Sequence, residues 1–164
     1  DMGLTLTGGA ALLKNIDNDY TKIRNNIIEM YPQNNFQYML DYLGLERLSY
    51  QSSNVDVCES FKTSETLGAI KPPVIKKEGY WIINTNHRFF YDDINYGLCI
   101  AKWIAEKLSV QVNHIDRLLL WAQKIMGLDI LDTNKQLKHE NMKNKFEYGL
   151  PSVYNLDTID DIVN

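Results

Sequence analysis

The chain has 164 residues, a formal net charge of −4 at pH 7, 45% hydrophobic residues and 23% charged residues. This length is that of one domain with a core of its own, and the composition excludes a disordered chain. The acidic balance argues against a nucleic-acid-binding protein. No apolar run approaches the roughly 18 residues of a membrane span. Two cysteines without a CxxC pair favour a reducing, cytoplasmic compartment.

The N-terminal third predicts helices and connecting turns. Residues 4–13 predict a short turn followed by the start of a helix. A capped helix is then expected to end at Pro32, and a second helix is expected over residues 34–48, where apolar side chains recur at spacings of three to five. Residues 51–60 are polar and predict a loop, and residues 63–67 predict a short helix.

The second half of the chain predicts a helical core. An extended passage at residues 71–73 and one strand-like run, Tyr80–Ile83, precede this core. Apolar residues then recur with helical spacing over residues 92–108 and again over residues 113–127, where Asn113 is the expected N-cap and Gly127 the expected C-cap. Two amphipathic helices joined by a short link predict an antiparallel pair, the centre of an all-α fold.

The same patterns predict the domain organisation. One helical domain is expected to span residues 1–164, and the polar residues 135–164 are expected to form a peripheral tail. The basic stretch at residues 135–145 is diluted by acidic and amide side chains, so it is interpreted as a solvated face and not as a binding patch.

The usual fingerprints of nucleotide and metal sites are absent from this sequence. The Gly8-Gly9 pair follows no strand and fits neither GxGxxG nor a P-loop. The three histidines, His87, His114 and His139, are 25 or more residues apart, which is too far for a metal-binding motif. We therefore predict no metal site, and no cofactor bound by this chain alone.

Charged groups gather in residues 86–98, where an amphipathic helix begins. Asp92 and Asp93 lie at the helix start, where the helix dipole favours their ionised forms, and such a carboxylate can hold an imidazole in one tautomer. Arg88 offers a planar fork to a substrate carboxylate. The alternative is structural, because aspartates cap helices and Arg88 can pair with them at the surface, and spacing alone favours this interpretation.

A series of short motifs carries a resemblance to a known family. It comprises a proline-containing lead-in, an Arg followed by two aromatic residues, an acidic pair, a Tyr-Gly-Leu turn and, after an apolar helix, a helix that begins Ile-Asp and closes at Gly-Leu-Asp. These are Pro72-Pro73, Arg88-Phe89-Phe90, Asp92-Asp93, Tyr96-Gly97-Leu98, and Ile115-Asp116 through Gly127-Leu128-Asp129. Over residues 64–129 the chain thus resembles the helical domain of octopine/nopaline (opine) dehydrogenases.

The resemblance implies an all-α, substrate-binding domain of the 6-phosphogluconate-dehydrogenase-like C-terminal type. It further implies an oxidoreductase that reductively condenses an amino acid with a 2-oxo acid, using NADH or NADPH. The cofactor then belongs to an N-terminal Rossmann domain outside this chain, so the chain alone is expected to be inactive.

The resemblance also implies roles for individual residues. Arg88 contacts a substrate carboxylate with Asp92 and Tyr96 as its substrate-side neighbours, and Asp93, the catalytic residue, supports a general acid/base histidine. In the family that histidine lies well upstream of the acidic pair. No histidine precedes His87 in this sequence, and His87 is interpreted as a packing residue.

Two other functions stay open. One is the helical domain of a ketopantoate- or 2-hydroxyacid-type reductase, which needs no amine co-substrate. The other is a stand-alone helical binding protein, which the missing histidine favours. The expected partners are the amino acid, the 2-oxo acid and the chain's own Rossmann domain. Neither nucleic acid nor a membrane is expected as a partner. A homodimer through exposed apolar helix faces is possible, but nothing in the sequence demands it.

Overall fold

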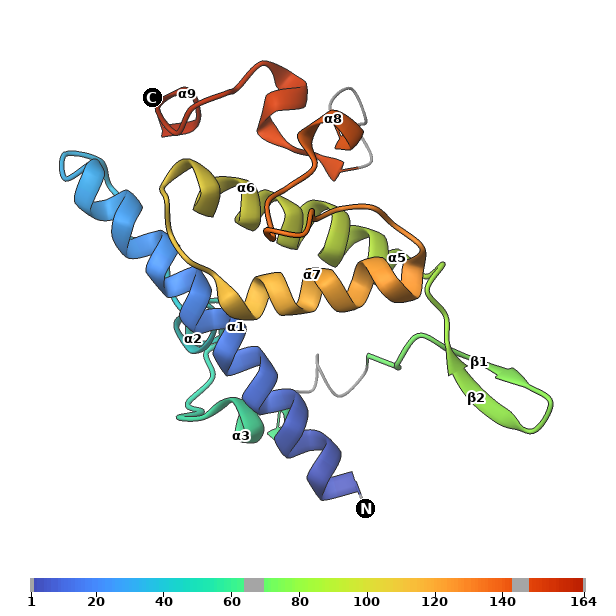
Figure 1. The fold of residues 1–164 in the computed structure, drawn as a ribbon. Coiled ribbons are helices and arrows are strands. Elements are labelled where there is room, and N and C mark those ends of the chain that lie inside the picture. The colour runs from blue at the N-terminus through green and yellow to red at the C-terminus, as the bar shows by residue number, and fades with distance from the viewer. Residues whose placement is uncertain (1, 64–69, 143–147, 164) are drawn as a thin grey trace. The chain divides into compact units, whose positions relative to one another are not determined.

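The computed structural model describes residues 2–63, 70–142 and 148–163, and the chain is mostly helical, as predicted (Figure 1). It divides after Pro72 into two compact units, Asp1–Pro72 and Pro73–Asn164. The prediction of one domain over residues 1–164 with a peripheral tail stays a prediction. None of the helices in the described ranges combines the length and apolarity needed to cross a membrane.

The first unit is built on one long helix, α1 (Met2–Met30), against which α3 (Val57–Thr63) packs. The turn predicted within residues 4–13 is wrong, because Gly8 and Gly9 lie inside α1. An interior glycine costs a helix about 1 kcal/mol relative to alanine, and a helix of 29 residues offsets this cost through cooperative propagation on both sides.

The second helix of this unit, α2 (Tyr42–Tyr50), begins later than the predicted residue 34. Its N-cap is Asp41, whose carboxylate accepts a hydrogen bond from the Gly44 N–H at 2.7 Å. Asn35 instead accepts the Gln37 N–H in a local turn, which competes with helix formation. The predicted loop at residues 51–60 is wrong in its second half, where α3 begins, and a short helix expected at residues 63–67 lies largely outside the described residues.

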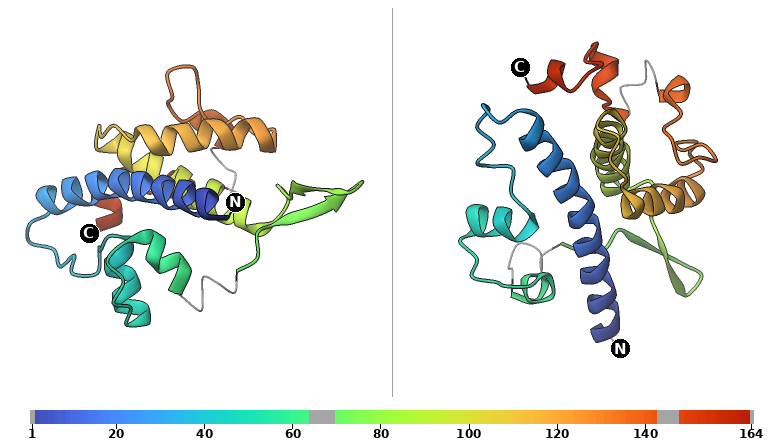
Figure 2. Two further views of the ribbon diagram at one scale, coloured as in Figure 1. Left: turned by 90° about the horizontal axis from the view of Figure 1, so that it is seen from below. Right: turned by 60° about the vertical axis from the view of Figure 1, so that its left-hand side comes forward.

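The second unit opens with a hairpin of β1 (Val74–Lys77) and β2 (Tyr80–Ile83). The strands are antiparallel, with Val74 opposite Ile83, and they extend away from the helices of this unit (Figure 2). Glu78 and Gly79 both have positive φ, 48° and 90°, as a two-residue type I′ turn requires. The strand-like run at residues 80–83 is confirmed, but its partner β1 was not predicted.

A continuous helical run then carries the chain from Arg88 to Lys107. It consists of α5 (Arg88–Phe90), a π-helical segment η1 (Tyr91–Leu98) and α6 (Cys99–Lys107). The chain reverses at residues 108–112, and α7 (Asn113–Met126) returns beside α6 (Figure 1). The predicted helix pair is therefore present, and its buried centre consists of Cys99, Trp103, Ala105, Ile115, Leu119 and Ala122.

The helix caps of α7 were predicted in part. Gly127 ends the helix with φ 67°, as a left-handed C-cap does. Asn113 is not the N-cap: Val112 takes that place, and no side chain caps the helix there. Asp116, in the position of a capping box relative to Asn113, is engaged with a neighbouring helix instead.

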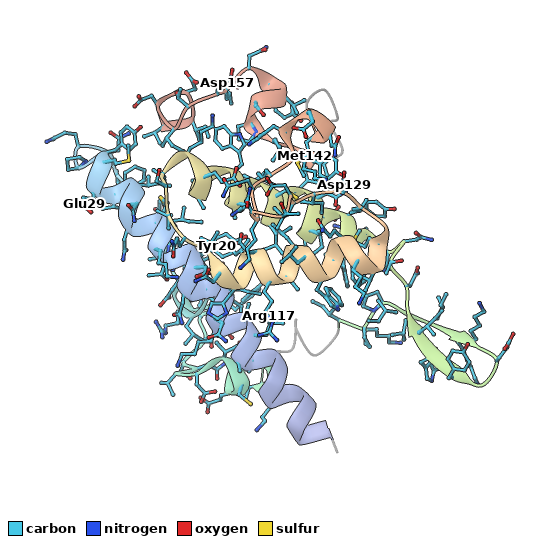
Figure 3. All side chains as sticks on the ribbon, in the orientation of Figure 1. Tyr20, Glu29, Arg117, Asp129, Met142 and Asp157 are labelled. Atoms are coloured by element: carbon cyan, nitrogen blue, oxygen red, sulfur yellow. The ribbon has the colours of Figure 1, made fainter. Side chains whose placement is uncertain are left out.

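The segment after α7 is irregular, and its described residues include short helical elements. These are α8 (His139–Met142), the 3-10 helix η3 (Pro151–Tyr154) and α9 (Asp160–Val163). Figure 3 shows its side chains, with Asp129 and Met142 labelled. Met142 and Leu150 are fully buried, so this segment contributes to the core of the second unit.

Candidate functional site

The helix that carries the charged segment begins at His87. The side chain of His87 accepts a hydrogen bond from the Phe89 N–H through Nδ1 at 3.3 Å, and its ring packs edge-on against the Phe89 ring. This contact fixes the start of α5 immediately before Arg88. His87 is therefore a capping and packing residue.

The π-helical winding of η1 distinguishes this site from an ordinary helix start. The Cys99 N–H donates to the carbonyl of Ile94, five residues back, which is the π pattern. Within η1, Asn95 is buried, and its Oδ1 has no hydrogen-bond partner among the described residues. Wide helical turns and unsatisfied buried polar groups both concentrate at functional sites, so η1 is the first candidate.

The structure brings two of the predicted site residues together. Arg88 donates through Nε to Oδ2 of Asp92 at 3.0 Å. The side chains of both are exposed, 77% for Arg88 and 50% for Asp92. Among the described residues, no hydrogen bond or ion pair occupies the terminal Nη1 and Nη2 groups of Arg88, so this edge of the guanidinium is free to bind an anion.

Asp93 lies within the electrostatic reach of both groups. Desolvation raises the pKa of the Asp93 carboxyl, the charge of Asp92 raises it further, and the charge of Arg88 opposes these effects. In the described part of the chain, Asp93 and Arg88 share no direct ion pair. Asp93 is thus a carboxyl that is harder to ionise than an ordinary aspartate and that has no hydrogen-bond or ion-pair partner among the described residues.

Tyr96 is oriented toward another part of the unit. Its ring lies against Gly149, where an added Cβ would overlap the ring. Gly149 has φ +57°, so glycine is favoured at that position on two counts. The structure therefore shows a packing partner for Tyr96, and its role beside the substrate stays a prediction.

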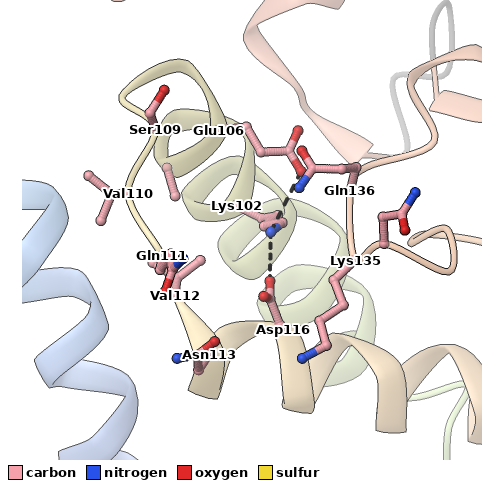
Figure 4. Close-up of a pocket in the computed structure, with 12 residues that line it drawn as sticks. Lys102, Glu106, Ser109, Val110, Gln111, Val112, Asn113, Asp116, Lys135 and Gln136 are labelled. Carbon is pink, nitrogen blue, oxygen red and sulfur yellow. Dashed lines mark ion pairs between the residues drawn. The ribbon is translucent and has the colours of Figure 1, made fainter.

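A second polar cluster was not predicted from the sequence. Lys102 and Asp116 are both nearly fully buried, and Nζ of Lys102 lies 2.7 Å from Oδ1 of Asp116 and 3.6 Å from Glu106. These three side chains line a pocket of about 420 Å³, shown in Figure 4. One signal for this cluster was visible in the sequence, the presence of Lys102 within an apolar helix. Its partner Asp116 lies 14 positions further on, so the pairing could not be seen from the sequence.

The contacts of this cluster indicate a structural role. Glu106 accepts the Leu137 N–H at 2.8 Å and lies 3.3 Å from Nε2 of His139. The cluster thereby joins α6, α7 and the segment that follows α7. Nowhere in the described ranges do three or more His, Cys, Asp or Glu side chains gather in a way that could hold a metal ion.

Comparison with known proteins relates residues 6–126 to the family described as NAD/NADP octopine/nopaline dehydrogenase, alpha-helical domain. Tauropine dehydrogenase of Arabella iricolor is 26% identical over 167 residues, which cover 94% of this chain and 39% of that protein. Opine dehydrogenase of Haliotis discus hannai is 25% identical over 97 residues, covering 59% of this chain and 23% of that protein. The chain thus spans well under half the length of these relatives.

Solved structures of octopine dehydrogenase share the fold. The complex with NADH and agmatine superposes with a TM-score of 0.78 at 21% identity, covering 94% of this chain and 38% of that one. The complex with NADH and pyruvate gives a TM-score of 0.74 at 23% identity, covering 95% and 37%. Because the family match extends over most of its length, this chain belongs to the octopine/nopaline dehydrogenase family and is its α-helical domain.

Proposed function

We propose that this chain is the substrate-binding part of an opine-type dehydrogenase, which reductively condenses an amino acid with a 2-oxo acid. The family membership supports this proposal, as do the names of the relatives, tauropine and opine dehydrogenase. The chain covers 39% of the tauropine enzyme. A protein of that length has room for a nucleotide-binding domain beside this one.

The described residues do not fit a nicotinamide cofactor. Gly8 and Gly9 lie inside α1, and the only sheet in the described ranges is the two-stranded antiparallel hairpin. A dinucleotide site needs a glycine-rich turn between a parallel strand and a helix. We therefore assign NADH or NADPH, which supplies the hydride, to a separate domain and assign only substrate and proton roles to this chain.

In this proposal Arg88 binds the carboxylate of the 2-oxo acid. Its terminal edge is free in the described part of the chain, and a guanidinium can donate two parallel N–H groups to a carboxylate. Asp93 holds a general acid/base imidazole and stabilises its protonated form. We assign that imidazole to a residue outside this chain, because the family resemblance places it upstream of the acidic pair, where this sequence has no histidine, and His87 caps α5 through Nδ1.

The observation that carries the proposal is an exposed arginine whose terminal edge is free in the described part of the chain and whose charge acts on the nearby Asp93 carboxyl. In the full-length enzyme, Arg88→Lys is expected to raise KM for pyruvate by about 10- to 100-fold, since an ammonium cannot form the bidentate contact. KM for the amino acid should change little. Steady-state kinetics with each substrate varied in turn measures both values.

The matched control is Arg117→Lys, which alters an exposed arginine on α7 and should leave both KM values unchanged. Unaltered kinetics with pyruvate and other 2-oxo acids in Arg88→Lys would overturn the assignment. Turnover of a 2-oxo acid without any amine would assign a 2-hydroxyacid-type reductase instead. No turnover with any combination would favour a helical binding protein without catalysis.

A further inference from the structure

The contact between Arg88 and Asp92 uses only one part of the guanidinium. Asp92 accepts the Nε–H at 3.0 Å with a single oxygen, Oδ2. A guanidinium has two edges that can bind a carboxylate in bidentate fashion, the Nε edge and the terminal Nη edge. Asp92 occupies the first of these edges, and in the described ranges no residue accepts from the second.

The position of this pair in the helix limits what the contact can do for folding. Arg88 and Asp92 are four residues apart across the junction of α5 and η1, with both side chains exposed. Exposed pairs at this spacing contribute little to protein stability, because water screens them. The contact therefore leaves the fold almost unaffected and acts mainly on the orientation of the Arg88 side chain.

Orientation matters for a side chain as long and as exposed as Arg88. Without a partner, a guanidinium that is 77% exposed samples many rotamers. A substrate carboxylate can then form the bidentate contact only with the fraction of molecules in which both terminal N–H groups of Arg88 face it. A fixed acceptor at Nε removes part of this cost before the substrate arrives.

We propose that Asp92 is a positioning residue that holds the Arg88 guanidinium through Nε and so presents its terminal edge to the carboxylate of the 2-oxo acid. This inference rests on the proposed function, since it takes Arg88 as the carboxylate-binding group. It separates the two adjacent aspartates: Asp92 acts on Arg88, and Asp93 acts on the acid/base imidazole.

The test uses the full-length enzyme with pyruvate as the varied substrate. Asp92→Ala is expected to raise KM for pyruvate about three- to tenfold, with kcat and KM for the amino acid nearly unchanged. Asp92→Asn keeps an oxygen that can accept the Nε–H, so it should restore most of the loss. Thermal unfolding of both variants should match that of the parent protein, because the pair is exposed.

The control is Asp129→Ala, which removes another exposed aspartate of the same unit that is paired with a lysine, Lys138, at 2.7 Å. It should leave KM for pyruvate unchanged. An unchanged KM in Asp92→Ala overturns the proposal. A lowered KM for pyruvate also overturns the proposal, because Asp92 would then compete with the substrate for Arg88. A loss of kcat without a change in KM overturns it too, because Asp92 would then act through Asp93 and not through Arg88.

Comparison of Arg88→Lys with Asp92→Ala distinguishes the substrate-binding role of Arg88 from the positioning role of Asp92. If Arg88→Lys impairs the use of pyruvate and Asp92→Ala does not, only the positioning role fails. If neither variant changes the kinetics with pyruvate, the proposed function fails with it.

Discussion

The Asp93 carboxyl is harder to ionise in the folded protein than in the unfolded chain. Desolvation raises its pKa above the ordinary value of 3.8, Asp92 raises it further, and Arg88 only partly opposes the two. The folded state therefore binds a proton more readily than the unfolded state. It follows that the contribution of Asp93 to stability is most favourable below the ordinary pKa and is lost as the pH rises through the raised one.

Asp93→Asn is expected to raise the thermal stability of the protein slightly at pH 7, since it removes a charge that the fold disfavours. The effect is small because Asp93 is an exposed residue and water screens its charge. The advantage should shrink as the pH falls through the raised pKa of Asp93 and should vanish below its ordinary value of 3.8, where the wild-type carboxyl is protonated in both the folded and the unfolded state. Thermal unfolding at a series of pH values measures this difference.

Asp161→Asn provides a control of opposite sign. Hydrogen bonds from Thr158 and from the Asp157 N–H lower the pKa of Asp161, so its contribution to stability is present above the ordinary pKa and is lost as the pH falls. Asp161→Asn should therefore reduce stability at pH 7 and have little effect in acid. A difference for Asp93→Asn that stays the same at every pH would contradict the assignment of its environment.

The candidate site was predictable because its residues are neighbours in the sequence. Arg88 and the acidic pair fall within six consecutive positions, so the helix start and the charge pattern located them together. Lys102 and Asp116 were missed for the converse reason. Their pairing depends on how two helices pack, and neither sequence position shows that alone.

At the scale of helices, the buried pair joins α6 to α7. Lys102→Met is expected to reduce the free energy of unfolding by about 3–5 kcal/mol, because it leaves Asp116 buried without its partner. The double change Lys102→Met with Asp116→Leu should cost far less, since it removes both charges. Urea denaturation of the single and double variants measures the difference.

Lys138→Met is the matched control, because Lys138 pairs with Asp129 at the same distance, 2.7 Å, but near the surface. It should change the unfolding midpoint little. If the single variant Lys102→Met were as stable as the parent protein, the cluster would not join the helices as described.

Local signals predicted helix positions less well than helix existence. The glycines in α1 suggested a turn, yet a long helix carries them. The strand β1 was missed because all four of its residues, including Lys76 and Lys77, are exposed and show no alternation of polar and apolar side chains. The π winding of η1 left no sequence signal, because it depends on how the helix packs into the core.

For the whole molecule, the fold class followed from the helix pair α6 and α7, whose apolar faces form the buried centre of the second unit. The division into two units after Pro72 did not follow, since composition changes little across it. The candidate site could be located but not completed from the sequence, which offers Arg88 and Asp93 but no histidine upstream of them. Under the proposed function, the acid/base imidazole is contributed from outside this chain.

The π winding of η1 also fixes the direction in which the Arg88 end of the helix leaves the core of this unit. A wide turn accommodates an extra residue, so deleting the exposed Tyr91, which precedes the buried residues of η1, should return the segment to α-helical winding. Such a deletion turns the Arg88 end by about 100° relative to α6 while the buried residues of α6 and α7 keep their register. We expect the shortened protein to unfold at nearly the parent temperature and to lose its use of pyruvate. Such a variant would separate the direction in which Arg88 points from the packing of the core below it.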